Sequence, residues 1–230
     1  MNIEEKLTES HKTLSKIMAP LMTIIFVVTI YIVQRSLSVI GGSPRLLEDL
    51  IYGENRQINL YSLEFSYRTM TIMWPGVLGA LCVVYYLLER KRNQIEISFN
   101  EIKTSKKIDI SYFDPFYIPA SLFKSKITRL IGQYFATFPL LAIGSHLMMI
   151  FMWLYKVGWE AQKLTLSNDL YSDKLIMITK GAVFSLTSIL SNIIGFIGAF
   201  LFYKTINNKI NTSISFIKTP NKKKSHVHNK

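Results

Sequence analysis

The chain of 230 residues contains one cysteine and few charged side chains, and both scarcities limit what it can be. Charged residues make up 18% of the sequence, below the ~25% of a typical soluble domain. The lone Cys82 excludes an intramolecular disulfide. The sequence also lacks the motifs H-E-x-x-H, C-x-x-C and G-x-S-x-G. We therefore predict a non-enzymatic protein with no catalytic residue, no metal site and no cofactor.

Long apolar runs account for much of what the chain does contain. Four stretches, at about residues 17–33, 70–88, 131–153 and 175–203, are each long enough to cross a bilayer. An α-helix needs ~20 residues to span the ~30 Å hydrocarbon core. The mean hydropathy of +0.23 agrees with this assignment. The sequence predicts an all-α integral membrane protein with a four-helix domain over residues 1–203 and a basic, largely disordered tail over 204–230.

The basic residues are unevenly distributed between the two sides of this arrangement. The N-terminal segment, the loop 89–130 and the tail together carry 19 Lys and Arg, against seven in the other two loops. Cytoplasmic segments of membrane proteins are enriched in Lys and Arg near the ends of the spans. We therefore expect both termini and the loop 89–130 to be cytoplasmic, and the Lys-, Ile- and Asn-rich composition suggests a bacterial inner membrane.

Alternating apolar and polar residues predict a small β-hairpin in the cytoplasmic loop. Ile95–Phe99 and Ile108–Tyr112 alternate with period two, and Lys103–Lys107 is a polar connection of hairpin length. The alternative is that the second span continues as a helix through this region. Residues Ala120–Leu130 combine apolar and basic side chains, as interfacial helices do.

The first external loop has two structural signals. Ser43 and Pro44 predict the start of a short helix that Gly53 can end. Alternating residues follow over 60–67, where we favour an amphipathic interfacial lead into the second span over a β-strand or an aromatic ligand-binding lip.

Small and polar residues recur along one face of the fourth span at helical spacing. They form a candidate helix-packing stripe, with pore lining as the alternative: Gly181, Ser185, Ser188, Asn192, Gly195 and Ala199. Gly76 and Ala80 form a smaller contact of the same kind in the second span. His146 and Lys180 are the candidate polar sites inside the membrane. Structural hydrogen bonding is the ordinary role of His146, with proton sensing as the alternative. Snorkelling is the ordinary role of Lys180, with ion or ligand contact as the alternative.

Clusters of basic residues outside the spans predict contact with anionic lipid head groups or with a protein partner. These candidates are Arg90, Lys91, Arg92, Lys106, Lys107, Lys222, Lys223 and Lys224. Nucleic acid is a poor candidate partner, since no aromatic residue is interleaved with the basic residues after Phe216.

These features lead us to expect an oligomeric membrane component that anchors a cytosolic partner or signals to it. The architecture resembles small four-span membrane components of bacterial envelope sensing, stress response and phage defence, although no sequence motif carries this likeness. The alternative function is an oligomeric ion channel or membrane-perturbing effector lined by the stripe of the fourth span. A transporter subunit is a lesser alternative.

Overall fold

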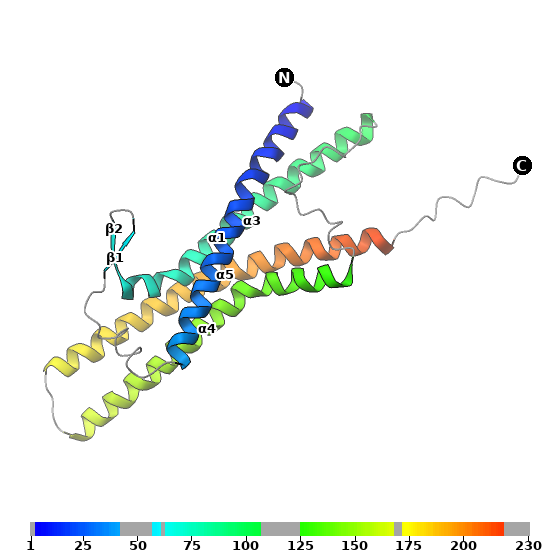
Figure 1. Ribbon diagram of the computed structural model, residues 1–230. Coiled ribbons are helices and arrows are strands. Elements are labelled where there is room, and N and C mark those ends of the chain that lie inside the picture. Colours follow the sequence, from blue (N-terminus) through cyan, green and yellow to red (C-terminus); the bar gives the residue numbers. More distant parts are fainter. Residues whose placement is uncertain (1–2, 42–56, 61–62, 107–124, 168–171, 219–230) are drawn as a thin grey trace, which may run out of the picture. The chain divides into compact units, whose positions relative to one another are not determined.

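Four long helices make up most of the computed structural model, which describes residues 3–41, 57–60, 63–106, 125–167 and 172–218. The helices are α1 (Ile3–Gly41), α3 (Tyr67–Lys106), α4 (Lys126–Ser167) and α5 (Ser172–Lys218), and two short strands, β1 (Gln57–Leu60) and β2 (Leu63–Ser66), precede α3 (Figure 1). All four helices contain a segment long and apolar enough to cross a membrane. The prediction of four helices long and apolar enough to span a membrane is confirmed.

The helices are much longer than a bilayer requires. They contain 39, 40, 42 and 47 residues. At ~1.5 Å per residue, each measures about 60–70 Å, roughly twice the hydrocarbon thickness. Each span therefore continues as a helix well beyond its apolar stretch.

This continuation corrects the predicted cytoplasmic hairpin. Ile95–Phe99, expected as its first strand, lies inside α3, while the expected second strand lies outside the described residues. The alternative, a helix that runs on from the second span, is what the structure shows. The intrahelical hydrogen bonds satisfy every interior backbone group, whereas an isolated hairpin is only marginally stable in water.

The segment before α3 also differs from our favoured interpretation. Leu63–Ser66 is a strand that pairs antiparallel with Gln57–Leu60, with Ile58 opposite Phe65. The period-two alternation therefore reports a strand, and α3 begins directly after it at Tyr67. The predicted helix that starts at Ser43 lies outside the described residues.

The start of α4 takes in the last five residues of the predicted interfacial helix. Lys126–Leu130 form its first turns and are continuous with the third span, while residues 120–124 lie outside the described part. Ser125 caps this helix, because its Oγ accepts a hydrogen bond from the backbone N–H of Thr128 at 3.0 Å.

The end of α5 likewise extends past the predicted end of the fourth span. Residues 204–218, which we assigned to the tail, continue the helix to Lys218, and residues 219–230 lie outside the described part.

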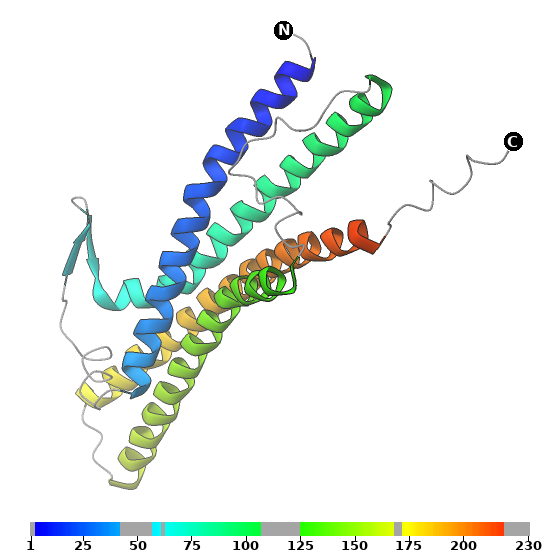
Figure 2. The same ribbon diagram turned by 45° about the vertical axis from the view of Figure 1, so that its right-hand side comes forward.

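The chain divides into two compact units. Unit 1 contains residues 1–23, 83–138 and 201–230, and unit 2 contains residues 24–82 and 139–200. The chain passes between the units within α1, α3, α4 and α5. In unit 1, the first part of α1 runs beside the last part of α3 (Figures 1 and 2), and the rings of Tyr85 and Phe202 lie 5.1 Å apart. In unit 2, the rings of Tyr31 and Trp74 lie 5.3 Å apart.

Buried positions recur along the helices at alternating intervals of three and four residues. On α3 they are Pro75, Leu78, Cys82, Tyr85, Glu89 and Arg92. The same alternation runs along α1 from His11 to Ile32. This is the spacing of side chains that pack knobs-into-holes in helical bundles.

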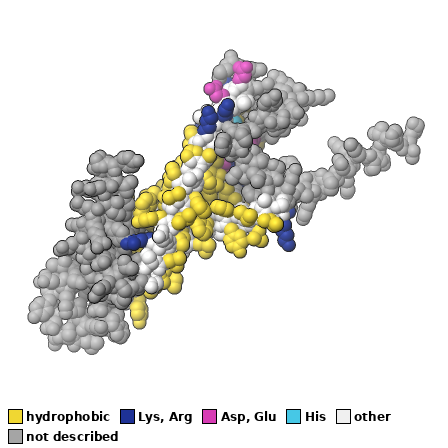
Figure 3. Space-filling model, in the orientation of Figure 1, with side chains coloured by type: hydrophobic (Ala, Val, Ile, Leu, Met, Phe, Trp, Pro, Cys, Tyr) yellow, Lys and Arg dark blue, Asp and Glu magenta, His cyan; other side chains and the backbone are white. Residues whose placement is uncertain are grey.

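Large apolar side chains also cover the outside of the helices. Val27, Leu141, Phe151 and Phe196 are all more than half exposed, and Figure 3 shows an extensive apolar surface along the described part of the chain. In water such a surface would favour aggregation, but in a bilayer it contacts lipid tails.

Candidate functional site

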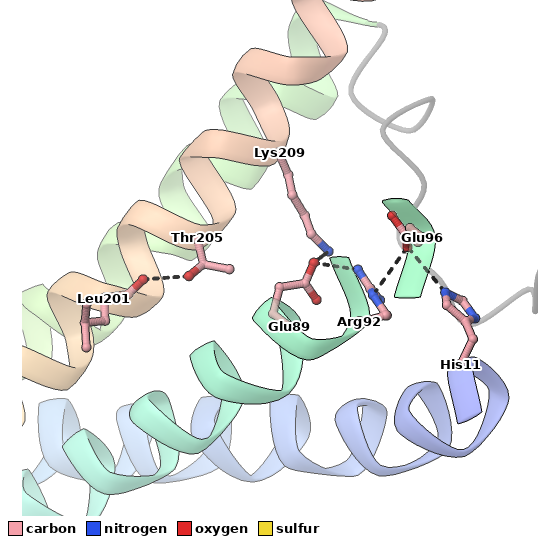
Figure 4. A network of polar contacts seen from close by, with 7 residues as sticks. All are labelled: His11, Glu89, Arg92, Glu96, Leu201, Thr205 and Lys209. Atoms are coloured by element: carbon pink, nitrogen blue, oxygen red, sulfur yellow. Dashed lines mark hydrogen bonds and ion pairs between the residues drawn. The ribbon is translucent and has the colours of Figure 1, made fainter. Parts of the chain in front are cut away.

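Five ionisable side chains from three helices meet in unit 1 and form what we call the ionic cluster. His11 comes from α1, Glu89, Arg92 and Glu96 come from α3, and Lys209 comes from α5 (Figure 4).

The cluster is a chain of contacts centred on two carboxylates. Glu89 Oε1 accepts a hydrogen bond from Arg92 Nη2 at 2.7 Å and pairs with Lys209 Nζ. Glu96 Oε1 lies 3.7 Å from Arg92 Nε and 3.3 Å from His11 Nε2. The contacts therefore connect α1 to α3 through Glu96, and α3 to α5 through Glu89.

Burial increases the contribution of these contacts to stability. The Glu89 side chain is 1% exposed, and those of His11 and Arg92 are nearly as inaccessible. Removing a charge from water is costly unless opposite charges and hydrogen bonds replace the hydration. With neutral His11, two carboxylates balance two cations, so the cluster has no net charge.

Two buried atoms of the cluster, Glu89 Oε2 and Arg92 Nε, make no hydrogen bond among the described residues, although Arg92 Nε keeps its ionic contact with Glu96. Glu89 Oε1 makes both of the carboxylate's charged contacts. Glu89 is thus the acceptor on which two cations of different helices converge.

The sequence analysis missed this cluster, although a signal was present. The three-and-four spacing of apolar residues on α3 continues through Tyr85 into Glu89, Arg92 and Glu96. We ended the second span at about residue 88 because the side chains became charged. Extending the pattern would have identified the charged residues that face inward.

The cluster corrects one predicted lipid or partner contact. Arg92 was grouped with Arg90 and Lys91, but it is buried and paired, whereas its two neighbours are exposed. Three consecutive helical residues point in directions ~100° apart, so they cannot share one environment. The side chain of Lys106 is not among those described, and Lys107, Lys222, Lys223 and Lys224 lie outside the described residues.

A second polar group in unit 2, which we call the amide cluster, contains His146, Ser188 and Asn192. Asn192 Nδ2 donates to the Ser188 carbonyl at 2.7 Å and lies 2.9 Å from His146 Nδ1. Asn192 Oδ1 lies 3.2 Å from the same nitrogen. The amide can therefore donate to a bare Nδ1 or accept from a protonated one, so His146 has a hydrogen-bonded partner in either tautomer.

The predicted stripe faces inward at the four positions that can be assessed. Ser188, Asn192, Gly195 and Ala199 are buried. Gly181, Ser185 and Lys180 belong to α5, but their side chains are not among those described. Burial within one chain is the arrangement expected of a packing stripe rather than a surface available to a neighbouring copy.

Glycines bring the backbones of α3 and α5 into direct contact along this stripe. A Cβ built on Gly198 would lie 2.5 Å from Gly79 Cα, and one built on Gly79 would lie 2.7 Å from Gly195 Cα. Beside them, the Gly76 N–H donates to Ser191 Oγ at 2.8 Å. The smaller contact predicted on the second span therefore involves Gly76 and Gly79, since Ala80 is exposed.

Replacing Asn192 with alanine should reduce the free energy of unfolding by about 1–2 kcal/mol. This exceeds the ~0.6 kcal/mol average for interhelical hydrogen bonds in membranes, because a buried histidine nitrogen loses its amide partner. Unfolding in detergent micelles measures the change. Ile193→Ala is the matched control, since its side chain is 51% exposed, and equal losses in both variants would contradict a structural role for the amide.

The two clusters contribute hydrogen bonds and charge pairs to the described residues. No group of three or more His, Cys, Asp or Glu among them is arranged to hold a metal ion. The ionic cluster instead connects α1 to α3 through Glu96 and α3 to α5 through Glu89.

Comparisons with known proteins do not assign the chain to a family. No family model matches the chain, and neither curated proteins nor solved structures yield a match.

Proposed function

We propose that this chain is a non-enzymatic component of the bacterial inner membrane that anchors a cytosolic protein or signals to it. Both termini and the loop 89–130 face the cytoplasm, and copies of the chain assemble with one another. Envelope sensing in a stress-response or phage-defence system is the setting that we assign to this activity.

The ionic cluster is the observation that carries the proposal. It joins α1, α3 and α5 near and beyond the charged ends of their apolar stretches. Helical continuations joined by buried ion pairs resist bending, unlike flexible loops. A displacement of one helix would therefore alter the positions of the others in the region that a cytosolic partner can reach.

An exposed apolar residue gives the partner a place to bind. Ile97 is 59% exposed and lies ten residues beyond Leu87, about 15 Å along α3. Its neighbours Asn93, Gln94 and Ser98 are exposed and polar. We assign Ile97 to the partner contact because it is the exposed apolar position among these polar neighbours.

The buried stripe on α5 favours this function over a channel. Ser188 and Asn192 are inside unit 2, so pore lining around an oligomer axis would first require them to leave their contacts. For the same reason, we assign self-assembly to the outward faces of the helices.

Cross-linking in cells, followed by purification in mild detergent and mass spectrometry, tests the proposal. We expect the full chain to capture a cytosolic protein and Ile97→Glu to reduce its recovery at least fivefold. Thr13→Glu, at an exposed polar position on α1, is the control for added negative charge. A full chain that captures copies of itself and no cytosolic protein would overturn the anchoring proposal and direct attention to bilayer conductance.

A further inference from the structure

Each of the four helices has an exposed basic residue next to the point where exposed apolar side chains begin. The pairs of basic and apolar residues are Lys16 with Ile17 on α1, Arg90 with Leu87 on α3, Lys126 with Ile127 on α4, and Lys204 with Phe200 on α5. Such a change from apolar to basic marks the boundary between hydrocarbon and head groups. We call Lys16, Arg90, Lys91, Lys126 and Lys204 the basic collar.

Contacts within unit 1 place three parts of the collar at similar depth. His11 on α1 contacts Glu96 on α3. Lys16 lies five residues from His11, and Lys91 lies five residues from Glu96, each toward the apolar stretch of its own helix. The ring contact between Tyr85 and Phe202 relates α3 to α5 in the same way. Lys204 lies two residues past Phe202, so it is close in depth to the start of the basic segment on α3.

The acidic residues near this boundary do not share its surface. Glu89 is buried, and Glu96 is occupied by Arg92 and His11. Among described acids, the exposed Glu9 is seven residues from Lys16, or about 10 Å along α1. Folding thus buries Glu89 and pairs the partly buried Glu96, while Arg90 and Lys91 stay exposed, although all four are close in sequence.

We infer that the basic collar binds the head groups of anionic phospholipids in the cytoplasmic leaflet. A surface with exposed cations and internally neutralised acids attracts a lipid with net negative charge more than a zwitterionic one. The separation of Glu9 from Lys16 is about one Debye length at physiological salt, so the exposed acid weakens this attraction little. This inference rests on membrane insertion and on the orientation in the proposed function, and not on the proposed partner.

Native mass spectrometry of the full chain in mild detergent tests the inference. The probes are phosphatidylglycerol and phosphatidylcholine with identical acyl chains. We expect the wild type to retain phosphatidylglycerol preferentially. The variant Lys16→Gln, Arg90→Gln, Lys91→Gln, Lys204→Gln should lower this preference at least tenfold, because each basic residue near a membrane contributes about a fivefold effect.

Two controls separate lipid binding from general charge and from folding. Lys6→Gln removes an exposed cation ten residues from Lys16 and should leave the preference unchanged. Lys16→Arg with Lys204→Arg should retain it, since the charges remain. Soluble glycerophosphate should not displace the lipid; displacement would show a phosphate site instead. Equal retention of both lipids by the wild type, or an unchanged preference in a folded four-residue variant, would overturn the inference.

Discussion

Replacing Glu89 with alanine should reduce the free energy of unfolding by about 3–5 kcal/mol, the range measured when one partner of a buried ion pair is removed. The Glu89 carboxylate is paired with Arg92 on its own helix and with Lys209 on α5. Without it, both cations stay buried with less compensation. Unfolding in detergent micelles at neutral pH measures the loss.

Arg90→Ala provides the matched control for this result. Arg90 is adjacent to Glu89 in the chain but exposed, so its replacement should change stability by less than about 0.5 kcal/mol. Glu89→Gln keeps the size and one acceptor while removing the charge. If the alanine and glutamine variants were both as stable as the wild type, the buried ion pairs would not hold α3 to α5.

Replacing Gly198 with alanine should destabilise unit 2 by about 3 kcal/mol, at the upper end of the range for overpacking. The added Cβ would lie 2.5 Å from Gly79 Cα and 2.6 Å from Gly79 C. These are backbone atoms, so no rotamer change relieves the collision, and α3 and α5 must separate. Thermal unfolding in detergent, with the yield of monodisperse protein, measures the effect.

Gly144→Ala is the control that separates this collision from the effect of removing a glycine. A Cβ on Gly144 meets nothing within 4 Å, and alanine is the better helix former by ~1 kcal/mol. This variant should therefore be as stable as the wild type or more stable. An equally stable Gly198→Ala would mean that α3 and α5 do not approach at their backbones.

The small-residue stripe of α5 illustrates what residue spacing alone can predict. Its spacing places Ser188, Asn192, Gly195 and Ala199 on one face of α5, because helical periodicity is a local property, and all four are buried. The pattern did not include Gly198, whose importance depends on Gly79, 119 residues away in the chain. Which small residue meets which is decided by how two helices cross.

The segment after the second span shows where such reasoning fails. Apolar and polar residues alternate over Ile95–Phe99 as they do in a strand. The segment also fits the continuation of a helix that buries Glu89 and Arg92 just before it. Short segments permit both interpretations, since each involves only a few apolar residues. The helix prevails where α1 and α5 supply His11 and Lys209 as partners for the inward-facing charges.

The amino-acid sequence by itself determined that the chain has four helices long and apolar enough to span a membrane, because apolar length and internal hydrogen bonding of the backbone are properties of each segment alone. Tertiary structure decided which charged residues are inside. Arg90, Lys91 and Arg92 are three consecutive basic residues, yet of these three only Arg92 faces Glu89 and the neighbouring helices. A side chain's environment depends on what the other helices place opposite it, and that information is absent from any single segment.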